Sequence, residues 1–161
     1  MASELQCFLL LLMSSATLHI SMAGDPDILS DFILPATVSY VVLKFPNGTI
    51  NPPHTHPSAS ELFFVLMGSL EVGFVDTTNK LFTQTLQKGD IYVFPKGLVH
   101  FRFNSDAQDP ALAFFAFDSV NAGTVSVPNS VFCTTIDDQV LDLSFKTDVT
   151  TIQKIKSGLS S

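Results

Sequence analysis

Short segments with the composition of β-strands follow one another from residue 37 to residue 118, and turn-forming residues separate them. The segments are rich in β-branched and aromatic residues, which are favoured on the pleated surface of a sheet. The expected strands are 37–45, 61–67, 69–76, 81–86, 91–94, 98–104 and 111–118. Many short strands without intervening helices predict an all-β protein, either an antiparallel sandwich or a barrel.

The aromatic residues of this chain are mostly phenylalanine. The sequence contains 15 phenylalanines and no tryptophan. Packing the interior of a small barrel is the commoner role of such side chains, and a stacking surface for a cofactor is the less favoured alternative. The phenylalanines therefore predict a barrel core.

The C-terminal part has a different pattern. Segments 136–143 and 149–155 are typical of short helices, and apolar residues recur every three positions in the second. Thr147 or Asp148 is suited to cap the start of this second helix. Such an amphipathic helix is expected to pack on its own barrel or on a neighbouring chain.

The N-terminal residues have the features of a secretory signal. Residues 7–13 are an unbroken run of 7 apolar residues, and the small-x-small sequence Ser21-Met22-Ala23 follows a polar stretch. A retained membrane anchor is disfavoured, because about 20 apolar residues are needed to span a bilayer. We expect a signal peptide at 1–23, a single domain at 24–161, and a secreted, extracellular protein with no transmembrane segment.

Cleavage of this signal would leave few chemically versatile side chains. The remaining histidines would be His54, His56 and His100, and the remaining cysteine would be Cys133. A single thiol excludes an intrachain disulfide. The lack of a disulfide is unusual for a small secreted domain. The formal net charge of −7 and the single arginine also argue against a nucleic-acid partner.

The three histidines and one glutamate form a candidate metal site. His54 and His56 are two positions apart, so their imidazoles point to the same side of an extended chain. A turn could bring Glu61 to the same point, and His100 lies in a second strand-like stretch. Imidazole and carboxylate groups bind Zn, Mn, Fe and similar cations. Three nitrogens and one oxygen suit Mn or Fe with two positions left open, whereas Zn usually closes at four ligands. Isolated histidines more often serve the core or the surface, but this spacing favours a metal site.

Glycines and prolines frame the candidate ligands in two regular patterns. The patterns are Gly48-x5-His54-x-His56-x4-Glu61-x6-Gly68 and Gly89-x5-Pro95-x-Gly97-x2-His100-x3-Asn104, with 20 residues between them. They match the two motifs of the cupin superfamily. Within it, residues 51–57 and 93–101, together with the arm at 25–27, resemble the germin and germin-like proteins of plants.

The resemblance implies a cupin jelly-roll β-barrel with short C-terminal helices. Germins are secreted to the apoplast, are often glycosylated, and assemble as homo-oligomers that are hexamers in the family. By this resemblance, His54, His56, Glu61 and His100 would bind Mn²⁺, although their spacing alone does not separate Mn²⁺ from Fe²⁺.

Three asparagines have candidate roles beside these ligands. Asn51 and Asn104 are candidates for contact with a substrate or with the ligands. Asn47 begins the N-glycosylation sequon Asn47-Gly48-Thr49, which is relevant to a secreted chain.

Several functions stay open from the sequence, and whether the protein is an enzyme is one of the open questions. The first is a manganese protein with superoxide dismutase activity. The second is a non-catalytic cell-wall protein, either a nutrient reservoir or a receptor, whose metal is structural. An Fe-dependent dioxygenase ranks below these. Oxalate oxidase is disfavoured, because germins with that activity carry a second asparagine where this chain has Val41.

The sequence departs from the germin pattern before the first motif. Germins generally have a cysteine pair and further strands in that region. Here the arm at 25–35 leads almost directly into the strand at 37–45. We therefore expect a barrel that is shortened on its N-terminal side and less stable than full-length relatives.

Overall fold

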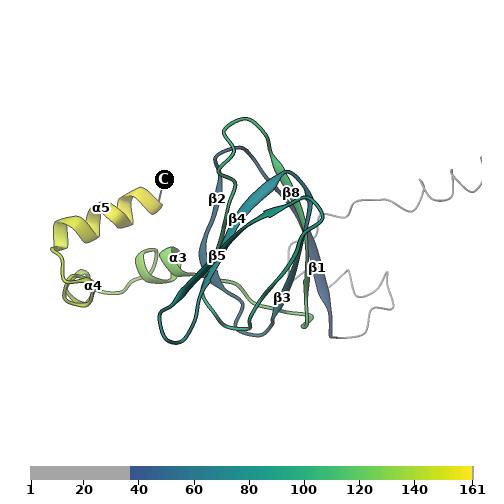
Figure 1. Cartoon of the computed structure of the whole chain (residues 1–161). Coiled ribbons are helices and arrows are strands. Elements are labelled where there is room, and N and C mark those ends of the chain that lie inside the picture. Colours follow the sequence, from purple (N-terminus) through teal and green to yellow (C-terminus); the bar gives the residue numbers. More distant parts are fainter. Residues whose placement is uncertain (1–36, 161) are drawn as a thin grey trace, which may run out of the picture.

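The computed structural model describes residues 37–160, which form a β-barrel followed by short helices (Figure 1). The strands are β1 (Ser39–Phe45), β2 (Ile50–Thr55), β3 (Glu61–Met67), β4 (Ser69–Val75), β5 (Leu81–Gln87), β6 (Ile91–Phe94), β7 (His100–Phe103), β8 (Ala111–Phe117) and β9 (Val125–Ser126). The helices are α3 (Val127–Phe132), α4 (Asp138–Phe145) and α5 (Val149–Leu159). The predicted all-β jelly-roll barrel with C-terminal helices is confirmed. The expected signal peptide and N-terminal arm lie outside the described residues.

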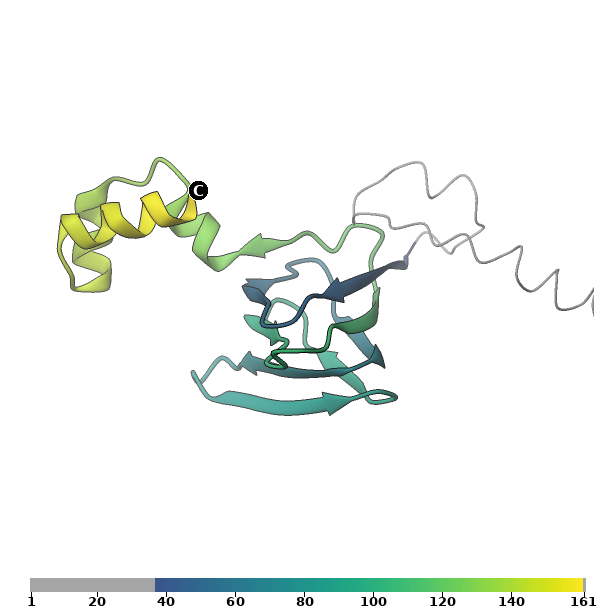
Figure 2. The same ribbon diagram turned by 90° about the horizontal axis from the view of Figure 1, so that it is seen from above.

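The strands form two antiparallel sheets that make up the two walls of the barrel (Figure 2). One sheet has the order β1-β8-β3-β6, and the other has the order β5-β4-β7-β2-β9. Strands that are distant in the sequence are therefore neighbours in space. In particular, β2 pairs with β7 so that His54 lies opposite His100.

Side chains from both sheets fill the barrel interior. Along β8, the buried residues Ala111, Ala113, Phe115 and Phe117 alternate with partly buried ones. This period of two is expected of a strand with one face on the core. Phe115 contacts Phe63 of β3 edge-on, with ring centroids 5.0 Å apart. Burial of each such side chain contributes about 1.5–3 kcal/mol, and these phenylalanines serve the core as predicted.

Gly68 carries the chain from one sheet to the other between β3 and β4. Its φ of +76° is in the left-handed region that glycine tolerates best. A Cβ atom at this position would lie 2.9 Å from the carbonyl oxygen of Pro110 and 3.0 Å from Cα of Ala111. Both the backbone conformation and the close approach of the next loop therefore require glycine here.

The C-terminal helices agree only in part with those expected from the sequence. The predicted helices 136–143 and 149–155 correspond to α4 and α5, and α5 continues further than predicted. Asp148 caps α5, because its carboxylate accepts a hydrogen bond from the backbone N–H of Thr151 at 2.9 Å. The sequence reasoning missed α3, whose first turn contains proline.

The three helices lie to one side of the barrel in both views (Figures 1 and 2). Helices α4 and α5 pack on each other, and α3 contacts both α5 and the strands β2 and β9. Leu141 and Ile152 are buried in this arrangement. Several apolar side chains on the same helices stay exposed, namely Val140, Leu143, Phe145, Ile155 and Leu159. Within residues 37–160, every helix is too short or too polar to cross a membrane.

Candidate metal centre

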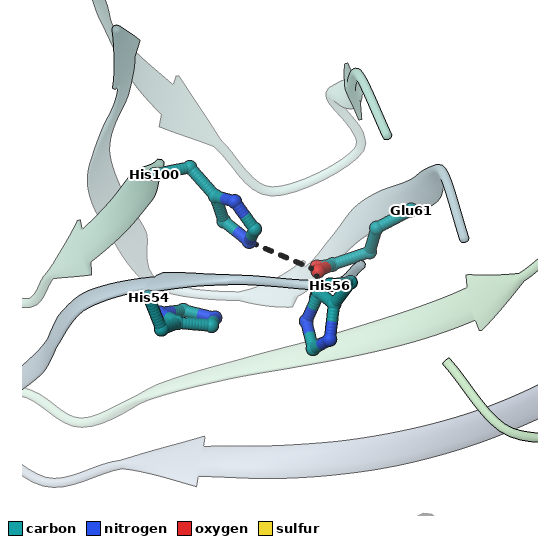
Figure 3. Close-up of side chains that lie close together, drawn as sticks. All are labelled: His54, His56, Glu61 and His100. Atoms are coloured by element: carbon teal, nitrogen blue, oxygen red, sulfur yellow. Dashed lines mark ion pairs between the residues drawn. The ribbon is translucent and has the colours of Figure 1, made fainter. Parts of the chain in front are cut away.

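Four candidate ligands converge inside the barrel from both sheets (Figure 3). His54 is in β2, His56 follows that strand directly, and His100 begins the adjacent strand β7. Glu61 begins β3 in the opposite sheet. All four side chains are buried. The structure thus brings together the four residues that the sequence motifs singled out.

The four groups are close enough to share one ion. One nitrogen or oxygen atom from each residue can be chosen so that all four lie within 4.8 Å of one another. Glu61 Oε2 is 3.0 Å from Nε2 of His56 and 3.4 Å from Nε2 of His100. Metal–ligand bonds of about 2.0–2.6 Å to a central ion would span such a cluster.

Backbone carbonyls fix the orientation of the three imidazoles. Nδ1 of His54 lies 2.7 Å from the carbonyl oxygen of Pro52. The corresponding distance is 2.5 Å from Nδ1 of His56 to the Gly123 oxygen, and 2.9 Å from Nδ1 of His100 to the Leu98 oxygen. A carbonyl oxygen only accepts hydrogen bonds, so each Nδ1 carries the hydrogen. In the neutral form of such a ring, Nε2 has a lone pair that can point toward the cluster, which is the arrangement of a metal-binding histidine.

Two atoms of the cluster lack a hydrogen-bond partner among the described residues. They are Oε2 of Glu61 and Nε2 of His100, and both are buried. A carboxylate oxygen and imidazole lone pairs all accept hydrogen bonds, so their close approach is unfavourable without a shared cation or proton. This donor set therefore fits a metal ion.

The structure adds a charged neighbour that the sequence reasoning missed, Arg102. Its side chain is fully buried, and Nη2 donates to Oε1 of Glu61. Nη1 lies 3.2 Å from Nε2 of His54. Arg102 follows His100 by two positions in β7, so the alternation of a strand places both side chains on the same face. That spacing was the available signal.

Phenylalanine rings surround the charged groups. The guanidinium carbon of Arg102 lies 4.7 Å from the ring centroid of Phe115, 4.9 Å from that of Phe94 and 5.6 Å from that of Phe63. Phe94 also stacks on His100, with ring centroids 4.5 Å apart. These contacts keep the site away from water and add cation–π attraction to Arg102.

The surroundings shift the protonation of two candidate ligands. Burial, and then the charge of Arg102, lower the pKa of His54 to about 3, so this ring is neutral at ordinary pH. Burial alone would raise the pKa of Glu61, but the Arg102 guanidinium holds it below its usual range. An ionised carboxylate and a neutral imidazole are the forms that bind metals.

The remaining candidate residues lie in different surroundings. Asn51 is partly buried in β2 and pairs with Arg102 across the strands. Asn104 is fully buried, and its amide donates to backbone carbonyls of Phe45, Pro46 and Asp109 rather than to the cluster.

Two further residues from the sequence analysis lie on the surface. Asn47 is exposed in the turn after β1, where Nδ2 donates to the Ala107 carbonyl oxygen at 2.9 Å. Cys133 is an exposed free thiol after α3. Neither residue contributes to the cluster.

A β-barrel with this histidine and glutamate cluster between its sheets is a cupin, and comparison with known families agrees. Residues 33–153 match the cupin family, so the chain belongs to it. The chain also belongs to the germin-like proteins within that family. It is 45% identical over 210 residues to germin-like protein 9-3 of Oryza sativa subsp. japonica, covering 99% of this chain and 98% of the relative. That alignment is 49 residues longer than the 161 residues of this chain, so the relative has segments without a counterpart here.

Other relatives match over part of their length. The rhicadhesin receptor of Pisum sativum is 46% identical over 122 residues, which are 74% of this chain and 56% of the relative. The solved structure of an oxalate oxidase is 34% identical, with a TM-score of 0.73, over 76% of this chain and 63% of the other. The chain therefore spans less than two thirds of these two proteins.

Proposed function

We propose that this chain is a secreted germin-like protein that binds manganese through His54, His56, Glu61 and His100 and has superoxide dismutase activity. The observation that carries the proposal is the buried Oε2 of Glu61, which lies 3.0 Å from Nε2 of His56 and 3.4 Å from Nε2 of His100 and has no hydrogen-bond partner among the described residues. A dication bound to these atoms would remove the repulsion among them.

The donor set supports manganese or iron over zinc. Three nitrogens and one oxygen leave two positions of an octahedron for other molecules, whereas zinc usually closes at four ligands. Membership of the germin-like proteins favours Mn²⁺ over Fe²⁺. Direct metal analysis decides between the two ions.

The residues of the chain have defined roles in this proposal. Bound manganese would supply the reversible one-electron transfer that conversion of superoxide to oxygen and hydrogen peroxide requires. The carbonyl bonds to His56 and His100 orient the rings before metal arrives, which reduces the reorganisation on binding. Glu61 supplies a single negative charge, so a bound dication would keep positive charge that attracts a small anion.

A non-catalytic role is the second candidate. The similarity to a protein named as a rhicadhesin receptor favours it, because that relative is 46% identical over most of this chain. In this case the metal would stabilise the barrel. Oxalate oxidase stays disfavoured despite the structural likeness, because Val41 packs against the apolar core at the position where a second asparagine is expected.

The surroundings of the protein in the plant are part of the same proposal. We propose that residues 1–23 are a signal peptide, that 24–161 form one domain, and that the protein lies in the apoplast as a homo-oligomer. The exposed apolar side chains of α4 and α5 support self-association, since such surfaces commonly mark interfaces.

The test is metal and activity analysis of the secreted protein. Wild type should contain manganese in near-stoichiometric amount, and it should accelerate superoxide loss but not oxalate oxidation. His54→Ala should lose both the metal and the dismutase activity, while the surface change Lys88→Gln should alter neither. If manganese-loaded wild type has no dismutase activity, the dismutase proposal is wrong and the non-catalytic role is favoured. If the protein never binds a metal, both candidate functions are wrong.

A further inference from the structure

Arg102 contacts two of the four candidate metal ligands. It is the single arginine of the chain, and only 1% of its surface is exposed. Its Nη2 donates to Oε1 of Glu61, and its Nη1 is 3.2 Å from Nε2 of His54. One guanidinium therefore contacts both a carboxylate and an imidazole of the cluster.

The contact with His54 uses the atom that would bind a metal. Nδ1 of His54 is 2.7 Å from the Pro52 carbonyl oxygen and carries the ring hydrogen. Nε2 then has the lone pair, and guanidinium nitrogens only donate hydrogen bonds. Arg102 and a metal ion would accordingly use the same lone pair of His54.

The charge of Arg102 also opposes a second cation. A guanidinium keeps its proton in proteins, so Arg102 balances the one negative charge of Glu61. A dication entering the cluster would then meet no net negative charge. The weak screening inside a barrel makes this repulsion larger than it would be at a surface.

The guanidinium of Arg102 is buried among aromatic rings, away from water. Phe63, Phe94 and Phe115 lie around its guanidinium carbon at 4.7–5.6 Å. A metal ion therefore has to bind in the presence of this charge.

We propose that Arg102 is a built-in cation that competes with metal ions for His54 and Glu61 and thereby limits the metal affinity of the site. The inference rests on the proposed metal function. The alternative role is positioning, in which Arg102 holds Glu61 in place for the metal. The two roles predict opposite results, because loss of a positioning partner lowers metal affinity about 10–100-fold.

The decisive experiment measures Mn²⁺ binding by calorimetry to chelator-treated protein. Arg102→Gln keeps hydrogen-bonding ability without the charge, so it should bind Mn²⁺ at least about tenfold more tightly than wild type. Arg102→Lys keeps the charge and should stay within about threefold of wild type. Lys88→Gln removes an exposed positive charge as a matched control and should leave the Kd unchanged.

The possible results separate this inference from the proposed function. Equal or weaker binding by Arg102→Gln overturns the inference and leaves the metal function intact. Tight binding by Arg102→Gln with none by wild type supports the inference and removes the proposed function. Absence of binding by both proteins overturns both.

A measurement on wild type keeps the inference testable if the variants fail to fold. Because the chain has one arginine, ¹⁵N-arginine labelling gives NMR signals from a single guanidinium. Titration with diamagnetic Zn²⁺ should shift these signals as the contact with His54 is lost. Zn²⁺ that saturates the protein without moving these signals would overturn the inference.

Discussion

Glu61 and Arg102 form a buried ion pair that joins the two sheets of the barrel. Glu61 begins β3 in one sheet, and Arg102 lies in β7 of the other. Their side chains are 1% and 2% exposed, and Nη2 of Arg102 donates to Oε1 of Glu61. Because neither charge reaches water, each depends on the other for compensation.

Removal of the negative partner should destabilise the barrel strongly. In chelator-treated protein, Glu61→Gln keeps the shape of the side chain but leaves Arg102 buried without a counter-charge. The expected loss is about 3–5 kcal/mol of unfolding free energy, measured by urea denaturation followed by circular dichroism.

The helical tail offers a matched control for this change. Asp138→Asn breaks the pair between Asp138 and Lys156, whose charged atoms are 2.7 Å apart and partly exposed. Water already screens that pair, so its loss should cost far less. Similar losses in the two variants would contradict the importance of the buried pair.

Replacement of a candidate ligand should abolish the stabilising effect of metal. Wild type should melt at a higher temperature with saturating Mn²⁺ than with chelator, because an ion that binds only the folded chain stabilises it. His54→Ala should lose this difference. Thr55→Ala is the control, because Thr55 is the next residue of β2 and points to the other side. A metal-induced rise that persists in His54→Ala would argue against His54 as a ligand.

Most of the candidate metal site was predictable because strand geometry and motif spacing act together. A period of two puts His54 and His56 on one side, and the two motifs place Glu61 and His100 at the facing strand ends. The role of Arg102 was not predictable from its residue type, since a lone arginine is usually on the surface. Only the pairing of β7 with β2 shows which inward side chain reaches the ligands.

The same limit applies to Asn104 and to α3. Asn104 ends the second motif, which made it a candidate for the site, but its amide joins the end of β1 to the loop before β8. Local spacing does not reveal the partner of such a group. Helix α3 has only 6 residues and begins with Val127-Pro128, so it has too few turns to give a clear periodic pattern.

The turn at Gly68 gives a prediction about stability that does not involve the metal. Gly68 and Gly89 both have positive φ, +76° and +96°, so alanine should cost each position about 1–2 kcal/mol of backbone strain. Only at Gly68 would the new Cβ also meet the backbone of Pro110 and Ala111. Gly68→Ala should therefore lower the unfolding free energy more than Gly89→Ala, as measured in urea. Equal losses would show that the loop moves aside without cost.

The exposed turn after β1 should carry a glycan if the chain is secreted as proposed. Asn47-Gly48-Thr49 is the single N-glycosylation sequon in the sequence, and Asn47 is exposed. Protein secreted from plant cells should lose mass on treatment with an N-glycosidase that accepts plant glycans, as seen by mass spectrometry. Asn47→Gln should abolish this loss, whereas Thr49→Ser keeps the sequon and should preserve it. Secreted wild type with the mass of the bare chain would exclude glycosylation at Asn47.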